Sequence, residues 1–505
     1  MINPLYDQLF GSHFGKSSPF LRLADGSVVT YAAFLGLAAQ MAHVLKQSGL
    51  QPGDRLAAQV QKSPEALALY AACVQAGVVF LPLNTAYTTE ELSYFIEDSG
   101  ARMIICDAKV EQALSSITAR LELSLKTLNA DGSGTLRDGA LVMPQAFPTV
   151  VRSADDLAAL LYTSGTTGRS KGAMLSQANL LSNAFTLAKE WRFASEDVLL
   201  HALPIFHTHG LFVATNVTLV VGASMIFLPQ FNVDQLVNLM QQATVLMGVP
   251  TFYTRLLDHP RFNRQLASGM RLFVSGSAPL LAETHFEFED RTGHCILERY
   301  GMTETNMNTS NPYYGERRAG TVGLPLPEVE VKVTDPETGA TLPGGTIGQI
   351  EVRGPNVFKG YWQMPEKTAA ELRADGFFVT GDLGKIDKDG YLHIVGRNKD
   401  LIISGGYNIY PKEIELVLDV QPGVLESAVI GVPHRDLGEA VIGVIVAEPG
   451  GHPDLDQIMA AVQTPLARFK HPKRLVLVDE LPRNTMAKVQ KDILRKKFKD
   501  AFHAV

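Results

Sequence analysis

The chain has 505 residues, of which 46% are hydrophobic and 19% are charged, and its net charge is −7. This length exceeds what one hydrophobic core usually supports, so two or more domains are expected. The acidic balance gives no overall attraction to nucleic acid or to acidic membranes. Three widely separated cysteines, Cys73, Cys106 and Cys295, show no metal-ligand spacing and favour a reducing, cytoplasmic compartment.

Residues 1 to about 150 alternate between helical and strand patterns. The spacing of apolar residues predicts helices at 31–47 and 64–75 and strands at 55–60, 78–83 and 103–106. Residues 132–148 show no clear period and are expected to form a surface loop. The N-terminal residues have neither a basic segment nor a continuous apolar core, so no signal peptide is expected.

Residues 151–330 continue the alternation. Short apolar runs predict strands at 157–161, 198–203, 244–248 and 270–275. The most apolar window, 211–229, is interrupted by polar residues and by Gly222, which favours a buried strand and helix over a membrane span. Alternating strands and helices predict a layered α/β sheet, in which sites gather at the carboxyl ends of the strands.

The pattern changes near residue 328. Short strand-like runs at 329–333 and 347–352 alternate with turns and predict a β-rich subdomain. Residues 411–505 read as a small α+β unit, with helices at 411–420, 454–464 and 489–499 and strands at 426–432, 440–447 and 474–478. The predicted fold class is therefore α/β, a large N-terminal layered domain with a β-rich subdomain, plus a small α+β C-terminal domain that begins near Lys399.

A loop rich in glycine and hydroxyl groups covers residues 162–172, with the sequence Tyr-Thr-Ser-Gly-Thr-Thr-Gly-Arg-Ser-Lys-Gly. Apolar runs flank it on both sides, so we expect a loop between two strands. Glycine lets the backbone approach an anion closely, and hydroxyls, amides and Lys171 can hold phosphate oxygens. The spacing is not that of a Walker A motif. Phosphate binding is favoured over an ordinary solvated loop.

Four further stretches join this loop. They are Arg-Tyr-Gly-Met-Thr-Glu-Thr at 299–305, Thr-Gly-Asp at 380–382, Gly-Arg-Asn-Lys-Asp at 396–400 and Pro-Arg-Asn-Thr-Met-Ala-Lys at 482–488. Together, in this order, they resemble the adenylate-forming superfamily of acyl-CoA synthetases, luciferases and peptide-synthetase adenylation domains. The resemblance covers nearly the whole chain. It implies that ATP activates a carboxylate to an acyl-adenylate, with release of pyrophosphate, and that a thiol then displaces AMP.

The resemblance also implies ATP, Mg²⁺ and CoA as cofactor and co-substrates, and it gives roles to individual residues. The β- and γ-phosphates would be held by the loop residues Thr163, Ser164, Gly165, Thr166, Thr167, Gly168 and Lys171. The remaining ATP and metal contacts would come from Thr303 on the α-phosphate, Glu304 on Mg²⁺, Tyr300 beside adenine, and Asp382 and Arg397 on the ribose. Lys488 would bridge the attacking carboxylate and the phosphate as a compact point charge.

In this superfamily a small C-terminal domain rotates between the two half-reactions. Lys399 matches the hinge position, which implies domains at 1–398 and 399–505. Gly405, Gly406 and Tyr407 would line the tunnel for the pantetheine arm of CoA. One residue departs from the superfamily pattern, because Ala487 stands where glycine normally precedes the final lysine. Alanine adopts positive φ poorly, so this substitution could slow the first half-reaction if that conformation is needed.

The expected acyl pocket is polar. His207 and Thr208 follow one predicted strand, Arg255 and Ser277 follow two others, and Arg299 directly precedes the Tyr300 turn. Two arginines converging on the acyl end would bind a second carboxylate bidentately. The blocks at 201–216 and 297–312 most resemble malonyl-CoA synthetases, so we expect malonate, with methylmalonate as a second substrate. His207 would be catalytic, and Thr208 and Met302 would limit the pocket.

Several alternatives stay open at this point. The acid could be oxalate or a short-chain monoacid, the chain could load a carrier protein, or it could bind nucleotide without catalysis. Residues 468–499 hold eleven Lys or Arg against three Asp or Glu, yet no aromatic platform interleaves them, so CoA phosphates are preferred over nucleic acid. The resemblance also implies a lysine acetyltransferase as a partner, acting on Lys488. Arg255 could instead be an ordinary solvent-facing helix residue.

Overall fold

The computed structural model describes residues 2–163, 170–404, 407–434, 437–463, 465–466, 468–484 and 488–502. The chain divides into two compact units, Met1–Glu330 with Val352–Phe378 and Val331–Glu351 with Val379–Val505. Each unit is described by itself. The domain boundary and hinge near Lys399 stay a prediction.

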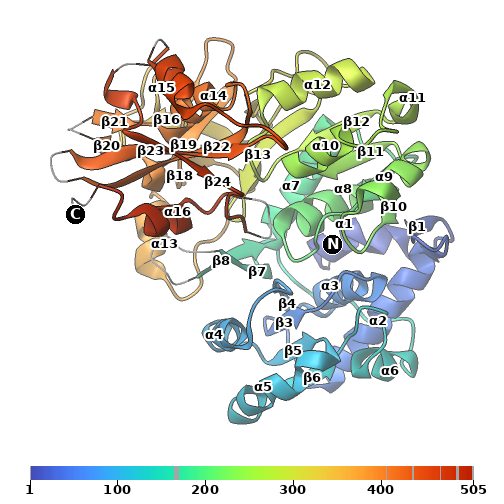
Figure 1. Ribbon diagram of the computed structural model, residues 1–505. Helices are drawn as coiled ribbons and strands as arrows, with labels where there is room; N and C mark the ends of the chain where they lie inside the picture. The colour runs from blue at the N-terminus through green and yellow to red at the C-terminus, as the bar shows by residue number, and fades with distance from the viewer. Residues whose placement is uncertain are drawn as a thin grey trace. The chain divides into compact units, whose positions relative to one another are not determined.

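The first sheet of unit 1 follows the alternation read from residues 55–176. Its strand order in the described chain is β6 (Ser124–Thr127), β5 (Met103–Cys106), β3 (Arg55–Gln59), β4 (Val79–Pro82), β7 (Leu157–Thr163) and β8 (Lys171–Ser176). All pairs are parallel except β7 with β8. Helices α4 (Thr89–Ser99) and α5 (Ala108–Arg120) bury one apolar face each against these strands (Figure 1).

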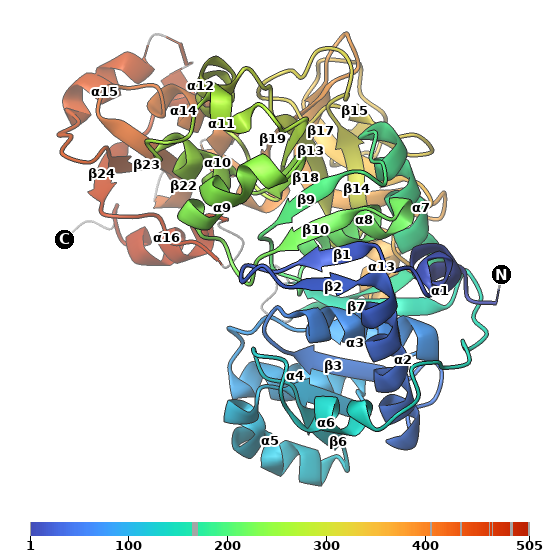
Figure 2. The same cartoon turned by 90° about the vertical axis from the view of Figure 1, so that its right-hand side faces the viewer.

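The second sheet of unit 1 carries most of the predicted acyl-site residues. Its strand order is β15 (Leu324–Pro325), β14 (Asn306–Ser310), β13 (Leu297–Met302), β12 (Leu272–Ser275), β11 (Val245–Gly248), β9 (Val198–His201), β10 (Ser224–Phe227), β1 (Pro19–Arg22) and β2 (Val28–Thr30). The strands from β13 to β1 are parallel, so their carboxyl ends meet at one edge. Figure 2 shows this sheet above the strands of the first.

Helices lie between and beside the sheets. Ser176 caps α7 (Gln177–Glu190) and forms a reciprocal capping box with Asn179. α2 (Tyr31–Gln47) and α3 (Pro64–Ala76) match the predicted helices closely. Tyr70 of α3 contacts Phe80 of the first sheet and Phe212 of the helical segment near the second. An aromatic contact thus joins the layers of this unit.

The remaining helices of unit 1 connect or cover the strands. Their bounds are α1 (Pro4–Leu9), α6 (Thr135–Leu141), the π-helical segment η2 (His209–Thr215), α8 (Asn216–Val221), α9 (Val233–Leu239), α10 (Pro250–Leu257), α11 (Arg264–Ala267), α12 (Ala282–Thr292) and α13 (Pro365–Glu371). The prediction of a loop over 132–148 was wrong, because α6 buries Leu136 and Ala140. Seven residues give too short a window for periodicity.

The apolar window at 211–229 folds as η2, α8 and β10, which confirms the prediction of a buried helix and strand. Gly222 ends α8 with φ +72°, the left-handed conformation that favours glycine. Across the described residues, none of the helices combines the length and hydropathy needed to cross a bilayer.

Unit 2 contains the β-rich part and the small α+β part that the sequence predicts. One sheet in its described residues has the order β16 (Glu330–Thr334), β17 (Gly348–Arg353), β18 (Phe378–Ile386) and β19 (Leu392–Arg397). The other joins β21 (Tyr407–Ile409), β20 (Ile402–Ser404), β23 (Gly438–Ala447) and β22 (Val424–His434), with β24 (Arg474–Val478) on β23. Helices α14 (Pro411–Leu418), α15 (Leu455–Val462) and α16 (Lys491–Phe498) complete it.

Candidate active site

The carboxyl ends of four adjacent parallel strands bring the predicted acyl-site segments together. β11 pairs with β9 on one side and with β12 on the other, and β12 pairs with β13. The polar segments that follow these strands therefore meet at one edge of the sheet, as the alternation predicts. This edge is where the predicted acyl pocket would lie.

Arg299 is the buried cation of this edge. It lies on β13, is 3% exposed, and its Nε and Nη2 atoms have no hydrogen-bond partner among the described residues. Burial lowers its pKa to about 9, so the guanidinium stays charged at neutral pH. A buried cation without a partner is costly, and this arrangement therefore favours an anionic ligand.

Two neighbours shape the space around the guanidinium. A Cβ atom at Gly276 would lie 2.4 Å from Cζ of Arg299, so only glycine leaves room there. Tyr253 of α10 is fully buried and donates its hydroxyl proton to the carbonyl of Val274, at 2.6 Å. The loop after β12 and the buried face of α10 thus hold Arg299 in place.

The histidine segment after β9 adds polar groups to the same neighbourhood. His209 is fully buried, its Nδ1 lies 3.3 Å from Oγ of Ser277, and its Nε2 has no partner among the described residues. Burial lowers the pKa of His209 well below its usual value, and the charge of Arg299 lowers it further. The imidazole is therefore neutral beside a charged guanidinium. Ser277 has φ +72°, a strained conformation of the kind found at functional sites.

The other predicted pocket residues lie nearby in the chain. Half-buried His207 accepts a hydrogen bond at Nδ1 from the backbone N–H of His209, at 3.2 Å. Thr208 is buried and donates to Oδ1 of Asn306, at 2.7 Å. Met302, at the end of β13, is half-buried.

Arg255 does not join this cluster. The buried face of α10 consists of Phe252, Tyr253, Leu256 and Leu257, and Arg255 lies on the exposed face of the helix. Residues two apart on a helix point in roughly opposite directions, so Arg255 points away from the side on which Tyr253 is buried. The prediction of two converging arginines is corrected accordingly: the buried cation is Arg299, and Arg255 is solvent-facing.

The predicted phosphate loop joins two antiparallel strands, as expected. Thr163 at the end of β7 pairs with Lys171 at the start of β8. The tip, with Ser164, Gly165, Thr166, Thr167 and Gly168, lies outside the described residues. Its base is held by Tyr94, whose hydroxyl donates to the carbonyl of Ser170 at 2.8 Å.

Lys171 belongs to a polar cluster that also contains Glu304. Its Nζ lies 3.1 Å from Oη of Tyr361, 3.3 Å from Oε2 of Glu371, and 4.2 Å from the centre of the Tyr361 ring. Oη of Tyr361 lies 3.0 Å from Oε1 of Glu304 and 2.6 Å from Oε2 of Glu371. The phenol therefore links the lysine of the phosphate loop to the predicted metal ligand.

The turn after β13 sets the position of Glu304. Gly301 is required there, because a Cβ would lie 1.7 Å from the carbonyl oxygen of Asn306. Glu304 is 4% exposed, and its carbonyl accepts the N–H of Phe358 at 2.8 Å. Tyr300 is buried and Thr303 is half-buried on the same segment.

In unit 2 the structure brings Asp382 and Arg397 together. They are cross-strand partners on β18 and β19, and Nε of Arg397 lies 2.6 Å from Oδ1 of Asp382. Asp382 is 4% exposed, its N–H donates to Oγ1 of Thr380 at 3.1 Å, and its carbonyl accepts Nε2 of Gln349 at 2.9 Å. A carboxylate fixed in this way suits the predicted recognition of a ribose diol.

Lys488 has an exposed side chain, and its backbone is hydrogen-bonded to Asn484. The backbone N–H of Lys488 donates to Oδ1 of Asn484, and the N–H of Asn484 donates to the carbonyl of Lys488, both at 3.0 Å. Ala487 lies outside the described residues. Asn484 therefore anchors the backbone of Lys488. The motif at 482–488 contains Asn484, but the sequence alone assigns it no role of its own.

The predicted hinge and CoA residues are exposed. Lys399 lies in the short turn Asn398–Asp400. Tyr407 is 56% exposed and stacks on Phe469 with ring centres 4.6 Å apart. Gly405 and Gly406 lie outside the described residues.

Three residues of these clusters were missed from the sequence. Tyr361 and Glu371 come 57 and 67 residues after Glu304 in the numbering, with no motif of their own beyond the Gly360-Tyr361-Trp362 run. Gly276 directly precedes Ser277, and nothing in the sequence marks it as a neighbour of Arg299. Gly360, directly before Tyr361, has φ +114°, a forced turn that the sequence alone does not reveal.

Comparison with protein families supplies the decisive observation. Residues 15–362 match the model of the AMP-binding enzyme family, and residues 413–488 match that of the AMP-binding enzyme C-terminal domain. The chain belongs to the AMP-binding enzyme family. This confirms the predicted superfamily and the predicted α/β fold class with its small C-terminal α+β part.

Members of this family are similar to the chain over nearly its full length. The crystal structure of ATP-bound MatB from Rhodopseudomonas palustris is 57% identical, with a TM-score of 0.98, and covers 99% of this chain and 100% of that chain. A feruloyl-CoA synthase from Amycolatopsis sp is 37% identical over 94% of both chains. A malonate–CoA ligase from Arabidopsis thaliana is 34% identical over 89% of this chain and 78% of that protein.

Proposed function

We propose that this chain is an AMP-forming malonate–CoA ligase, which uses ATP to join malonate to CoA. The observation that carries the choice of acid is the buried guanidinium of Arg299, whose Nε and Nη2 have no partner among the described residues. A second carboxylate on the acid would pair with it bidentately. An acid with a single carboxylate, which is consumed in the reaction, would leave that cation unpaired.

The polarity of the pocket separates malonate from the other acids named among the relatives. A feruloyl-CoA synthase and a malonate–CoA ligase are both similar to this chain, so family membership alone leaves the acid open. An aromatic acid would put a ring against a charged guanidinium and a neutral buried imidazole, and would satisfy neither Arg299 nor His209. A short acid with a terminal carboxylate can satisfy both, and methylmalonate differs from malonate by one methyl group.

The proposed reaction has two steps. A carboxylate oxygen of malonate attacks the α-phosphorus of ATP, the bond to the bridging oxygen breaks, and pyrophosphate leaves. The CoA sulfur then attacks the acyl carbonyl, the bond to AMP breaks, and the thiol proton is released. Lys488 would stabilise the negative charge that builds on the α-phosphate, and Lys171 would hold the terminal phosphates.

Glu304 fits a role as ligand to Mg²⁺, which, when bound, neutralises phosphate charge. Two carboxylates, from Glu304 and Glu371, lie within hydrogen-bond distance of the hydroxyl of Tyr361. A phenol has one proton and can donate to one of them. Carboxylate oxygen is thus left with accepting capacity, and such oxygen is the ligand that Mg²⁺ prefers.

The exposed side chain of Lys488 also supports control by acetylation, which would remove its charge.

The proposal is tested by measuring thioester formation by the full chain with ATP, Mg²⁺ and CoA. Malonate, methylmalonate, oxalate, succinate, acetate and ferulate are compared in parallel. Malonate should exceed acetate by at least ~100-fold in kcat/KM, because a site built to pair with a group rejects an analogue that lacks it. Acetate or ferulate as the preferred acid would contradict the proposed substrate.

The matched variants are Arg299→Ala and Arg255→Ala. Arg299→Ala should remove the preference for malonate, whereas Arg255→Ala should leave it unchanged because that side chain is exposed.

Acetylation is tested separately: mass spectrometry of the protein isolated from its own cells should find a fraction of Lys488 acetylated, and that fraction should form no adenylate. Unmodified Lys488 under all growth conditions would contradict this part.

A further inference from the structure

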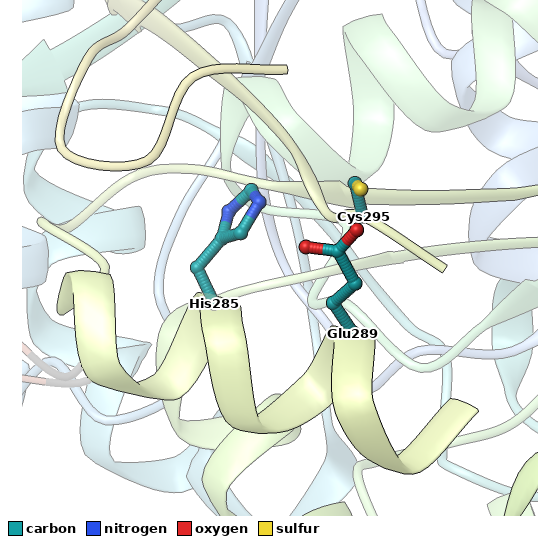
Figure 3. A group of neighbouring side chains, drawn as sticks. All are labelled: His285, Glu289 and Cys295. Carbon is teal, nitrogen blue, oxygen red and sulfur yellow. The ribbon is translucent and has the colours of Figure 1, made fainter. Parts of the chain in front are cut away.

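A cluster of three metal-ligating side chains lies outside the site described above. His285 and Glu289 belong to α12, and Cys295 lies just after the helix (Figure 3). One potential ligand atom from each residue lies within 4.8 Å of the others. An imidazole nitrogen, a carboxylate oxygen and a thiol sulfur are the ligand types that Zn²⁺ takes in proteins.

The local sequence explains why these side chains converge. Residues 285 and 289 are four apart on a helix, so their side chains lie on the same face, one turn from each other. Gly293 then ends α12 with φ +78°, a left-handed conformation that reverses the chain. This reversal brings Cys295 back beside the last turns of the helix, and Figure 3 shows both helical side chains extending toward its sulfur.

A second observation, independent of the cluster, concerns the buried polar atoms behind it. His285 is 2% exposed and its Nδ1 has no hydrogen-bond partner among the described residues. The facing atom, Oε1 of Glu298, is 3.8 Å away, buried and equally without a hydrogen bond. The two atoms face each other within ion-pair distance but are less than 1 Å too far apart for a hydrogen bond, and leaving that bond unmade in the interior is unfavourable.

A carboxylate behind a histidine is the arrangement that orients metal-bound imidazoles. A histidine that binds a metal through one ring nitrogen donates the proton of the other to a carboxylate or carbonyl, which fixes its tautomer and orientation. Glu298 is placed to accept that proton from Nδ1. Metal binding by the other ring nitrogen of His285 would thus also satisfy the buried pair.

We propose that His285, Glu289 and Cys295 bind one Zn²⁺ ion, with a water molecule as the fourth ligand. Tetrahedral zinc holds such atoms about 3.5 Å apart, so the cluster must contract by roughly 1 Å. Glu289 is exposed and Cys295 is half-buried, and both can move by side-chain rotation. The positive charge already present, on Arg317, is directed at the carbonyl of Cys295, to which its Nη1 donates at 2.7 Å.

The bound ion would stabilise the backbone at the start of β13. Glu298 lies directly before Arg299 on that strand, and Cys295 lies two residues before its start. An ion that ties α12 to the entry of β13 would hold the backbone that carries the buried arginine. This role does not depend on which acid the enzyme uses, so a failed test of the metal site would not contradict the proposed function.

The test uses Co²⁺ as a spectroscopic probe of the full chain after removal of metals with a chelator. A cobalt ion bound by a thiolate gives a charge-transfer band in the near ultraviolet, which an ion held by carboxylates and phosphates at the Glu304 site does not give. We expect this band with one Co²⁺ per chain, its displacement by Zn²⁺, and no displacement by excess Mg²⁺. Zn²⁺ should also raise the Tm of the chelator-treated protein.

Two variants and a control make the result specific. Cys295→Ser should abolish the band although Cys73 and Cys106 remain. Glu289→Gln should weaken Co²⁺ binding by at least ~10-fold, because losing even an outer partner of a metal-binding residue costs that much. Glu283→Gln, an exposed carboxylate on the same helix, should leave binding unchanged. A band that persists in Cys295→Ser, or no band in the unaltered chain, would overturn the proposal.

Discussion

The guanidinium of Arg299 lies against the backbone of Gly276, so closely that a methyl group at position 276 would sit 2.4 Å from its Cζ and Nη1 atoms. Gly276 directly follows β12, and Arg299 lies on the neighbouring parallel strand β13. The proposed receptor for a second carboxylate therefore depends on the absence of a side chain at position 276 as much as on the guanidinium of Arg299. Its cation is charged, buried and unpaired among the described residues.

Gly276→Ala should weaken the use of malonate while the protein still folds. The new methyl group must displace the guanidinium, and a misplacement of about 1 Å can cost ~100-fold in rate. We expect kcat/KM for malonate to fall by roughly 10–100-fold and that for acetate to change little. Steady-state kinetics with both acids measure this.

The matched control for this change is Gly269→Ala. A Cβ there has a single neighbour, the carbonyl oxygen of Gln241 at 4.0 Å, so it adds a methyl group without a clash. It should leave both acids unaffected. Full malonate activity in Gly276→Ala would mean that Arg299 does not act from the position seen here.

Tyr361→Phe should raise the KM for ATP. The phenol hydroxyl contacts Glu304, Glu371 and Lys171 within 3.1 Å, and its removal leaves the two carboxylates without their shared proton. Losing hydrogen bonds to charged groups costs about 1.5–3 kcal/mol, which corresponds to roughly 10–100-fold. The measurement is the KM for ATP at saturating Mg²⁺ and malonate.

Tyr87→Phe removes a hydroxyl elsewhere in unit 1 and serves as the control for this change. Its KM for ATP should equal that of the unaltered protein. If Tyr361→Phe has the same KM as this control, the polar cluster does not contribute to nucleotide binding.

Most of the fold was predictable because it depends on local periodicity. The helix at 31–47 and the strand at 103–106 have the predicted bounds, and Ser176, a residue type that favours helix starts, caps α7. These features rest on apolar spacing and on side chains that bond to their own backbone. The helix at 135–141 was missed because its two buried residues do not make a pattern that can be distinguished from a loop.

The site was predictable only where its residues form contiguous motifs. Asp382 and Arg397 lie in two such motifs, and the antiparallel register makes them an ion pair. Tyr361 lies in none, and its contact with Glu304 depends on the path of the chain between them. The position of Arg255 depended on helix phase: the apolar pattern of 252–257 allowed either orientation, and the packing of Tyr253 decided it.

A buried lysine gives a prediction about pH. Nζ of Lys62 lies 2.8 Å from both Nδ1 and the carbonyl oxygen of His201, and burial lowers the pKa of Lys62 well below its usual value. An unfolded lysine keeps its proton to about pH 10.4, so between the two pKa values the unfolded chain binds more protons. The free energy of unfolding therefore rises with pH in this window.

Lys62→Met should remove this dependence. The difference in free energy of unfolding, unaltered protein minus variant, should increase with pH by up to ~1.4 kcal/mol per unit. Urea unfolding of both proteins at about pH 8 and about pH 9.5 measures it, and Lys46→Met, an exposed lysine, is the control. A difference that does not change with pH would show that Lys62 stays charged in the folded protein.

Ala487→Gly should speed the first half-reaction. Asn484 anchors the backbone of Lys488 by two hydrogen bonds, both at 3.0 Å, so the position of this lysine depends on its backbone. The resemblance to the superfamily implies glycine before this lysine, and an alanine held at positive φ would cost of order 1 kcal/mol, or about 5-fold in rate. We expect the rate of adenylate formation to increase by up to ~5-fold, and the measurement is the rate of pyrophosphate release. Transfer from preformed malonyl-adenylate to CoA should be unchanged, and Lys488→Ala should block the first step alone. Equal rates of adenylate formation in the unaltered protein and in the Ala487→Gly variant would mean that the backbone at position 487 adopts an ordinary conformation in which alanine is harmless.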